Sequence, residues 1–342
     1  MKALVLNSIQ EVTADSTPLE LVDIPIPKPK DNELLIEVST CGVCHTELDE
    51  IEGRTPPPSF PVVPGHQVIG RVVDRGANTS AFQPGDRVGI AWIFSTCGAC
   101  QHCLSGDENL CPEFKATGRD VHGGYAEYMV IPSGYAFPIP ETFSDIKAAP
   151  LLCAGAIGYR SLKLTGINDG NIIGLTGFGG SGHIVLKLVK HIYPNSPVFV
   201  FSRTAQEREF AIELGAAWAG DISERPPNLL DAVIDTTPVW KPVLESLLKL
   251  KPGGRLVINA IRKEDSDREN LLKINYSSHL WMEKEIKSVA NVTRNDVAGF
   301  IKLAAEIPLV PETQEFFFAD ANRALVELKT RKIRGAKVLR IK

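Results

Sequence analysis

Hydrophobic and polar positions divide the chain into parts with different periodicity. Up to about residue 150, short apolar runs alternate imperfectly with polar positions and predict strands at residues 2–6, 33–39, 68–74, 87–90 and 125–131. Turn-forming segments such as Pro84-Gly85-Asp86 separate these runs. Strands this short and this often interrupted favour a compact, barrel-like β-rich domain.

After about residue 155, strand and helix patterns alternate. Strands are predicted at residues 171–177, 198–202, 231–235, 255–260 and 286–292. Apolar positions 184, 185, 188, 189 and 192 form one face of a helix predicted over 181–192. A second helix is predicted over 204–214, and Gly215 follows it as a C-terminal cap. This alternation predicts a parallel sheet covered by helices, and therefore an α/β fold.

The last part of the chain does not continue this alternation of strands and helices. From about residue 293 the strand–helix alternation is absent at first, and the chain closes with an extended apolar run at 336–341. We expect this segment to return to the first domain. The predicted organisation is a β-rich domain over residues 1–153, an α/β domain over 154–292 and a return segment over 293–342.

Composition narrows the class of protein. The 342 residues are 44% hydrophobic and 23% charged, as in ordinary globular proteins. A net charge of −4 offers no basic field for nucleic acid or an anionic membrane. The sequence contains no apolar run long enough for a membrane span, and its start lacks a secretory signal pattern. We therefore expect a cytoplasmic protein.

Four of the seven cysteines lie within one short segment, in the pattern Cys97-x2-Cys100-x2-Cys103-x7-Cys111. Such spacing lets backbone turns at Gly98 and Gly106 bring four thiolates to one centre. A tetrahedral thiolate set with no open position is typical of structural zinc. An iron–sulfur cluster is the alternative, since four thiolates suit it as well.

A glycine-rich segment, Gly177-Phe178-Gly179-Gly180-Ser181-Gly182, matches the pattern G-x-G-x-x-G. It follows a predicted strand and opens a predicted helix, which is the context that dinucleotide binding requires. Gly177 would allow the tight turn, Gly179 and Gly180 the approach of a pyrophosphate, and Gly182 close packing of helix on strand. The phosphates would then lie at the helix N-terminus.

Three further motifs are Cys41-Gly42-Val43-Cys44-His45-Thr46-Glu47, Pro64-Gly65-His66-Gln67 and Leu152-Cys153-Ala154-Gly155. Together with the cysteine segment and the glycine fingerprint, they make the chain resemble the zinc-dependent alcohol dehydrogenases of the medium-chain dehydrogenase/reductase superfamily. The resemblance covers essentially the whole chain. It implies a GroES-like catalytic domain with a four-cysteine lobe, then a Rossmann doubly wound domain, then the return segment.

The resemblance also implies roles for individual residues. Cys44, His66 and Cys153 would hold a catalytic zinc, the Cys₂His set known from alcohol dehydrogenases, with the fourth position left for water or substrate oxygen. Thr46 would bond the substrate oxygen and begin a proton relay, and His45 would face the cofactor phosphates. Glu47 would orient His66.

This chain departs from the family pattern at two positions. The roles of two aromatic residues also have alternative interpretations. Gln67 stands where many members have a glutamate, and Asp49 stands where many have the histidine that completes the relay. Trp92 and Phe94 are either pocket-wall residues or ordinary core aromatics.

The cofactor preference is predicted from the end of the second strand of the α/β domain. NAD-binding domains usually carry an acidic residue there, whereas Phe201-Ser202-Arg203-Thr204 has none. Ser202 and Thr204 can donate to a 2′-phosphate and Arg203 can bind its oxygens, so the segment favours NADP(H) over NAD(H). The alternative is that Arg203 is a solvated surface charge.

The predicted function is hydride transfer between NADP(H), or NAD(H), and a small alcohol, aldehyde or ketone, with two zinc ions per chain in a homo-oligomer, either a dimer or a tetramer. One alternative is a zinc-free enone or quinone reductase of the same superfamily, which usually lacks the cysteine lobe. Another is a zinc-ribbon module that binds nucleic acid or protein, which the acidic charge and the fingerprint disfavour. Counting the bound zinc ions separates these functions.

Overall fold

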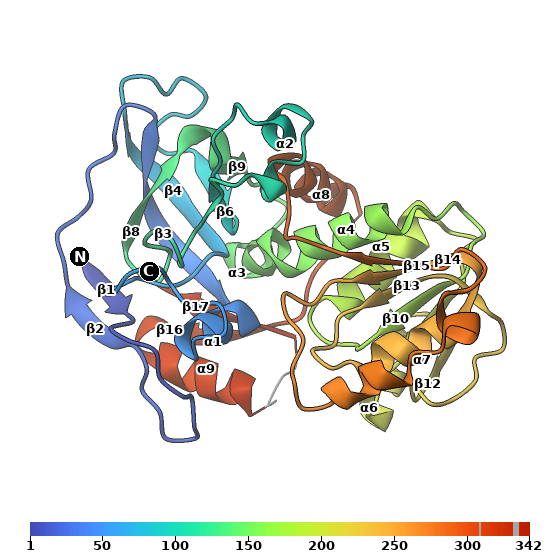
Figure 1. Cartoon of the computed structure of the whole chain (residues 1–342). Coiled ribbons are helices and arrows are strands. Elements are labelled where there is room, and N and C mark those ends of the chain that lie inside the picture. The colour runs from blue at the N-terminus through green and yellow to red at the C-terminus, as the bar shows by residue number, and fades with distance from the viewer. Residues whose placement is uncertain (308, 331–334) are drawn as a thin grey trace. The chain divides into compact units, whose positions relative to one another are not determined.

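The computed structural model describes residues 1–307, 309–330 and 335–342, and its chain forms two compact units (Figure 1). The first unit comprises Met1–Ala156 and Val292–Lys342, and the second comprises Ile157–Asn291. Among the described residues, no helix has the length and apolar character needed to cross a membrane.

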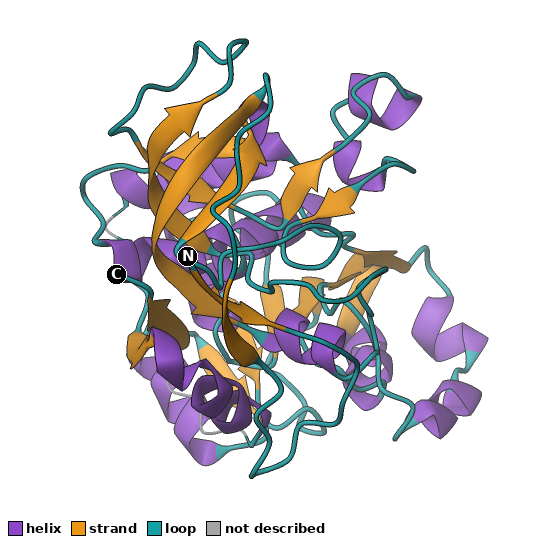
Figure 2. Cartoon of the chain, turned by 90° about the vertical axis from the view of Figure 1, so that its left-hand side faces the viewer, coloured by secondary structure: helices purple, strands orange, loops and turns teal. Residues whose placement is uncertain are grey.

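The first unit is built on a largely antiparallel seven-stranded sheet in the order β16-β17-β3-β4-β5-β9, with β8 also paired to β3. Figure 2 shows how strongly its strands curve. Two small pairs, β1 with β2 and β6 with β7, complete the strands of this unit. Their bounds are β1 Lys2–Val5, β2 Glu20–Asp23, β3 Glu33–Val43, β4 Val68–Arg75, β5 Arg87–Ile90, β6 Ile93–Ser95, β7 Lys115–Ala116, β8 Tyr128–Pro132, β9 Ala136–Pro138, β16 Thr313–Phe317 and β17 Ala336–Arg340.

The last part of the chain lies in the first unit. Strand β17 pairs antiparallel with β3, with Leu339 opposite Cys41 and Val338 opposite Gly42. The end of the chain thereby covers the part of β3 that immediately precedes Cys44. Val338 and Leu339 are fully buried there. The pairing therefore fixes the strand that leads into the segment containing Cys44.

Helices of the first unit cover and connect these strands. Their bounds are α1 His45–Ile51, α2 Gln101–Leu104, α3 Asp145–Ala148, α8 Arg294–Glu306 and α9 Ala321–Lys329, while α4 (Ala154–Thr165) leads from the first unit into the second. From about residue 293 the sequence shows no strand–helix alternation at first, and the structure places helix α8 there. It begins with a capping box between Thr293 and Asp296 and buries Val297, Phe300 and Ile301.

The second unit contains the predicted parallel sheet, in the order β12-β11-β10-β13-β14-β15. The chain moves from β10 to one side and then restarts beside β10 on the other side, which is the doubly wound order with its switch point between β10 and β13. The bounds are β10 Ile173–Thr176, β11 Val198–Phe201, β12 Trp218–Gly220, β13 Leu230–Asp235, β14 Leu250–Ile258 and β15 Glu285–Ser288, with helices α5 Gly182–Ile192, α6 Ala205–Glu213 and α7 Lys241–Lys249.

Helices on both faces bury this sheet, and Figure 1 shows α5 and α7 on opposite sides of it. Helix α5 buries the apolar face that the sequence predicts, including Ile184, Val185 and Leu188. Helix α7 packs Val243, Leu244 and Leu247 into a cluster with aromatic and aliphatic side chains of the strands. A strand buried on both faces reads as a continuous apolar run, which is why β10 and β11 are predicted well.

Two predicted strands are shorter in the structure for identifiable reasons. The strand predicted over 286–292 ends at Ser288, and Asn291 adopts a φ of 59° that breaks extended geometry. The strand predicted over 125–131 begins only at Tyr128, because the Tyr125 amide donates to the Pro64 carbonyl and the Tyr125 carbonyl accepts from Leu4.

Candidate functional site

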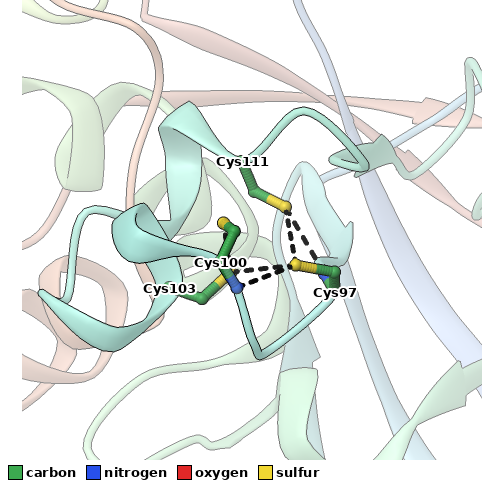
Figure 3. Close-up of side chains that lie close together, drawn as sticks. All are labelled: Cys97, Cys100, Cys103 and Cys111. Carbon is green, nitrogen blue, oxygen red and sulfur yellow. Dashed lines mark hydrogen bonds between the residues drawn. The ribbon is translucent and has the colours of Figure 1, made fainter.

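Among the described residues, metal-type donors gather in two sets, and the first contains Cys97, Cys100, Cys103 and Cys111. Their sulfurs lie within 4.8 Å of one another and point toward a common centre (Figure 3). Individual Sγ–Sγ distances are 3.5 Å for Cys97–Cys111, 3.6 Å for Cys100–Cys103 and 3.9 Å for Cys97–Cys103. Tetrahedral zinc with Zn–S bonds of ~2.3 Å separates its sulfurs by roughly 3.8 Å, so the four residues fit the ion.

Local backbone geometry explains why the four thiols converge. Gly98 and Gly106 adopt φ values of 72° and 82°, which let the loop turn sharply between the cysteines. Hydrogen bonds from the amides of Ala99 and Cys100 lower the pKa of the Cys97 thiol to about 7. Cys97 is therefore favoured as the thiolate, the form that binds a metal. Although a hydrogen bond from the Cys97 amide lowers it, burial and the side chains of Cys97 and Cys103 raise the pKa of the Cys111 thiol to about 11.

A charged contact anchors this lobe to the return segment within the first unit. The Arg294 guanidinium donates to both carboxylate oxygens of Glu108, at 3.0 and 2.7 Å. The same guanidinium lies over the ring of Tyr135, whose hydroxyl contacts the Thr96 hydroxyl next to Cys97. The lobe is thus fixed at both of its ends.

The second donor set is Cys44, His66 and Cys153, and its ligand atoms also lie within 4.8 Å of one another. The Cys44 Sγ is 3.6 Å from the His66 Nε2. Neighbouring Cys153, together with burial, raises the pKa of the Cys44 thiol well above its usual value. Two thiols and an imidazole that converge in this way suit zinc, and three protein ligands leave a position for a further group.

Helix α1 starts at this set. Cys44 is its N-cap, and the Sγ accepts a hydrogen bond from the Thr46 amide at 3.3 Å. Glu47 completes the capping box by accepting from the Cys44 amide at 2.8 Å. The cap therefore fixes both the cysteine and the hydroxyl residue two positions later.

Glu47 also contacts the imidazole, in the position that the family resemblance implies. Its Oε1 lies 2.6 Å from the His66 Nδ1, which leaves Nε2 directed at Cys44. Although burial lowers it, the negative charge of Glu47 and the neighbouring Cys44 raise the pKa of His66 well above its usual value. The Glu47 carboxylate thus both caps helix α1 and contacts His66 of the second donor set.

The remaining predicted residues of this region take different positions. His45 is exposed at the first position of α1, and Thr46 is half-buried beside Cys44. Asp49 is buried, and its Oδ1 accepts from the Arg54 Nε at 2.6 Å. Gln67 is buried against Gly42, where an added Cβ would stand 2.7 Å from the Gln67 amide. The relay roles of Thr46 and Asp49 stay predictions.

Glu50 is a buried acid of this site that sequence reasoning missed. It is 1% exposed, and burial, followed by the charge of Glu47, raises its pKa to about 8. The missed signal is the spacing of three residues between Glu47 and Glu50, which places them on one face of a helix. Trp92 is buried too, with its ring 5.2 Å from that of Phe114 and 5.2 Å from the Arg119 guanidinium carbon. Phe94 is also buried.

In the second unit, the glycine fingerprint forms the turn between β10 and α5. Gly177 has a φ of 80°, and an added Cβ at Gly182 would stand 2.8 Å from the Gly177 carbonyl oxygen. At Gly179 and Gly180, an added Cβ would meet no atom of the described residues within 4 Å. A glycine-lined open surface at a helix N-terminus suits a pyrophosphate, because the amides of the first helical turn have no acceptor within the helix.

A buried ion pair braces this turn and was missed by the sequence analysis. Asp235, at the end of β13, accepts from the Lys263 ammonium and from the Thr176 and Thr237 hydroxyls. The Lys263 Nζ also donates to the Thr237 carbonyl at 2.7 Å. The loop that follows β13 is therefore held against the fingerprint, where a Cβ at Gly177 would stand 2.7 Å from the Thr236 Oγ1.

The end of β11 differs from the sequence-based expectation. Ser202 is buried and Arg203 exposed, but the Ser202 hydroxyl donates to the carboxylate of Glu207 in α6. Residues 201–204 contain no acid, yet the fold supplies one to Ser202 from the helix that follows. The Arg208 Nη1 donates to the Ser202 carbonyl at 2.8 Å.

Comparisons with known proteins agree with this architecture. Residues 30–141 match the family model of the alcohol dehydrogenase GroES-like domain. A probable alcohol dehydrogenase of Mycobacterium tuberculosis is 43% identical over 332 residues, which are 96% of this chain and 94% of that protein. An alcohol dehydrogenase of Geobacillus stearothermophilus is 32% identical over 100% of this chain and 99% of its own. Among solved structures, a cinnamyl alcohol dehydrogenase of Sorghum bicolor superposes with a TM-score of 0.85 at 25% identity, covering 99% of this chain and 97% of that one.

Proposed function

Because the chain belongs to the zinc-dependent alcohol dehydrogenases of the medium-chain dehydrogenase/reductase superfamily, we propose that it binds two zinc ions with separate roles and prefers NADP(H) to NAD(H). It is an NAD(P)-dependent oxidoreductase that interconverts alcohols and carbonyl compounds. We assign catalysis to residues 1–153 with the return segment 293–342, and dinucleotide binding to residues 154–292.

The convergence of Cys44, His66 and Cys153 carries the catalytic assignment. When bound, zinc at this set supplies Lewis-acid polarisation of the substrate oxygen, and the nicotinamide supplies or accepts hydride. Glu47 holds the imidazole in position. The Thr46 hydroxyl accepts the proton of the alcohol as it passes its own hydroxyl proton on toward solvent, and both transfers run in reverse when a carbonyl compound is reduced. The four cysteines of the lobe hold the second, structural ion. Thiolate sets of this kind need a reducing compartment, so we place the enzyme in the cytoplasm.

Two guanidinium groups near the end of β11 support the preference for NADP(H). Arg203 is exposed directly after Ser202, and Arg208 is held at the same strand end by its bonds to the Ser202 and Arg203 carbonyls, at 2.8 and 3.0 Å. A 2′-phosphate can accept from such groups through charge-assisted hydrogen bonds, which a 2′-hydroxyl cannot match.

Replacing Arg203 by alanine should raise the KM for NADPH by roughly 10-fold or more, because one charged hydrogen-bond donor is lost. The KM for NADH should change little, and Ser202→Asp should shift the preference toward NADH. Lys190→Ala is the control, since it removes an exposed cation at the other end of α5. Steady-state kinetics with both cofactors measure the effect. A wild-type enzyme that is faster and tighter with NADH would refute the preference.

We further propose that the protein is a homo-oligomer that uses the outer edge of β15. All four residues of this edge strand are exposed, and such an edge is a template for pairing with another strand. Exposed apolar side chains lie on it or just before it in the chain, namely Tyr276, Trp281, Met282 and Ile286. Sedimentation velocity should give a dimer or tetramer, and Ile286→Lys should weaken that assembly. A wild-type monomer at micromolar concentration would contradict this assignment.

A further inference from the structure

A carboxylate from helix α6 lies at the end of β11, although residues 201–204 of this strand end contain no acid. Ser202 is 6% exposed, and its hydroxyl donates to Glu207 Oε2. Glu207 is the third residue of α6, where its amide donates to the N-cap hydroxyl of Thr204 at 3.2 Å. Because the helix cap fixes the backbone and Ser202 fixes the side chain, the half-buried carboxylate has a defined place at the strand end.

This carboxylate and the nearby guanidinium groups favour different ligands. A carboxylate only accepts hydrogen bonds, so it suits a ribose 2′-hydroxyl and repels a 2′-phosphate. Arg203 and Arg208 favour the phosphate instead. In addition, the Ser202 hydroxyl cannot donate to a phosphate while it donates to Glu207. The same strand end therefore holds groups suited to each of the two cofactors.

We propose that Glu207 is a specificity-determining residue for the dinucleotide, which weakens NADP(H) binding and keeps NAD(H) usable. This inference rests on the proposed binding of the adenosine ribose at the end of β11. It goes beyond the proposed NADP(H) preference, because it assigns an opposing group and expects the preference of the wild-type enzyme to be moderate.

Glu207→Gln tests this role with little structural change, since the amide oxygen can still accept from Ser202 while the charge is lost. The Kd for NADPH, measured by calorimetric titration, should fall by roughly 5- to 10-fold, as expected when a like charge near a surface is removed. The Kd for NADH should stay the same or rise. Glu209→Gln is the matched control, because it removes an exposed negative charge from the same helix.

The outcomes separate this inference from the proposed function. A Kd ratio of NADH to NADPH that rises at least about fivefold in Glu207→Gln and less than about twofold in Glu209→Gln supports the role of Glu207. An unchanged ratio in Glu207→Gln, or an equal change in both variants, overturns it. If the wild-type protein binds NADH more tightly but Glu207→Gln still shifts the ratio, the NADP(H) preference fails and the role of Glu207 stands.

Discussion

Replacing Cys44 by serine should abolish turnover while the fold and the dinucleotide affinity stay close to wild type. A serine hydroxyl is a poor zinc ligand, but it can still accept the N-cap hydrogen bond that Cys44 accepts from the Thr46 amide. Loss of Lewis-acid stabilisation should lower kcat by at least about 10³-fold. His66→Ala should behave in the same way. Metal analysis should find one zinc ion per chain instead of two, and titration with NADPH should give an unchanged Kd.

The same chemical change in the cysteine lobe should have the opposite consequence and serves as the matched control. Cys100→Ser should destabilise the protein, because binding of a structural zinc contributes directly to folding. We expect its thermal midpoint to fall by about 5–10 °C, with activity lost through unfolding. Full activity in a Cys44→Ser protein with one zinc ion would refute the catalytic assignment. An unchanged thermal midpoint in Cys100→Ser would refute the structural one.

The two metal sets differ in how far the sequence alone predicts them. In the lobe, all four cysteines lie in one short segment that begins at Cys97 and ends at Cys111, so their spacing alone indicates a common centre. Cys44, His66 and Cys153 are far apart in the chain, and only the family resemblance joined them. The structure supplies the reason, because β3 and β4 pair antiparallel with Cys41 opposite Val68. Cys44 just beyond β3 and His66 just before β4 therefore emerge at the same end of the sheet.

The buried strands were predicted well because they are continuous apolar runs, and the α5 face because its apolar residues recur with helical periodicity. Helix α8 interrupts the strand–helix alternation and so is not predicted from it, although Thr293-x-x-Asp296 carries the spacing of a capping box, a helix start signal. Local signals of this kind are present in the sequence and can be used.

Glu207 shows a different limit of sequence reasoning. Residues 201–204, from which an acidic side chain would extend directly from the strand end, contain no acid. The acid instead comes from the first turn of α6, which folds back so that Glu207 meets Ser202. Which side chain of a first helical turn reaches the preceding strand depends on the helix cap. Residue order alone does not determine it.

Thr46→Ala should lower kcat by roughly 10²–10⁴-fold, the range typical of a lost acid–base group. Thr46 lies half-buried at the second position of α1, two residues beyond Cys44. Its backbone amide, which donates to the Cys44 Sγ, is retained in every variant except proline. Removal of the hydroxyl therefore leaves the helix cap and the cysteine in place and takes away the proton acceptor alone.

Two further variants at this position isolate the hydroxyl. Thr46→Ser keeps it and should retain most of the wild-type kcat, whereas Thr46→Val keeps the shape and should resemble alanine. Zinc content and thermal midpoint should match wild type in all three proteins, which separates a chemical defect from a folding defect. If the alanine, valine and serine variants all stay near wild-type rate, the proton takes another route. The ion-paired Asp49 and the buried Glu50 would then be the next groups to replace, because both lie on the helix that begins at Cys44.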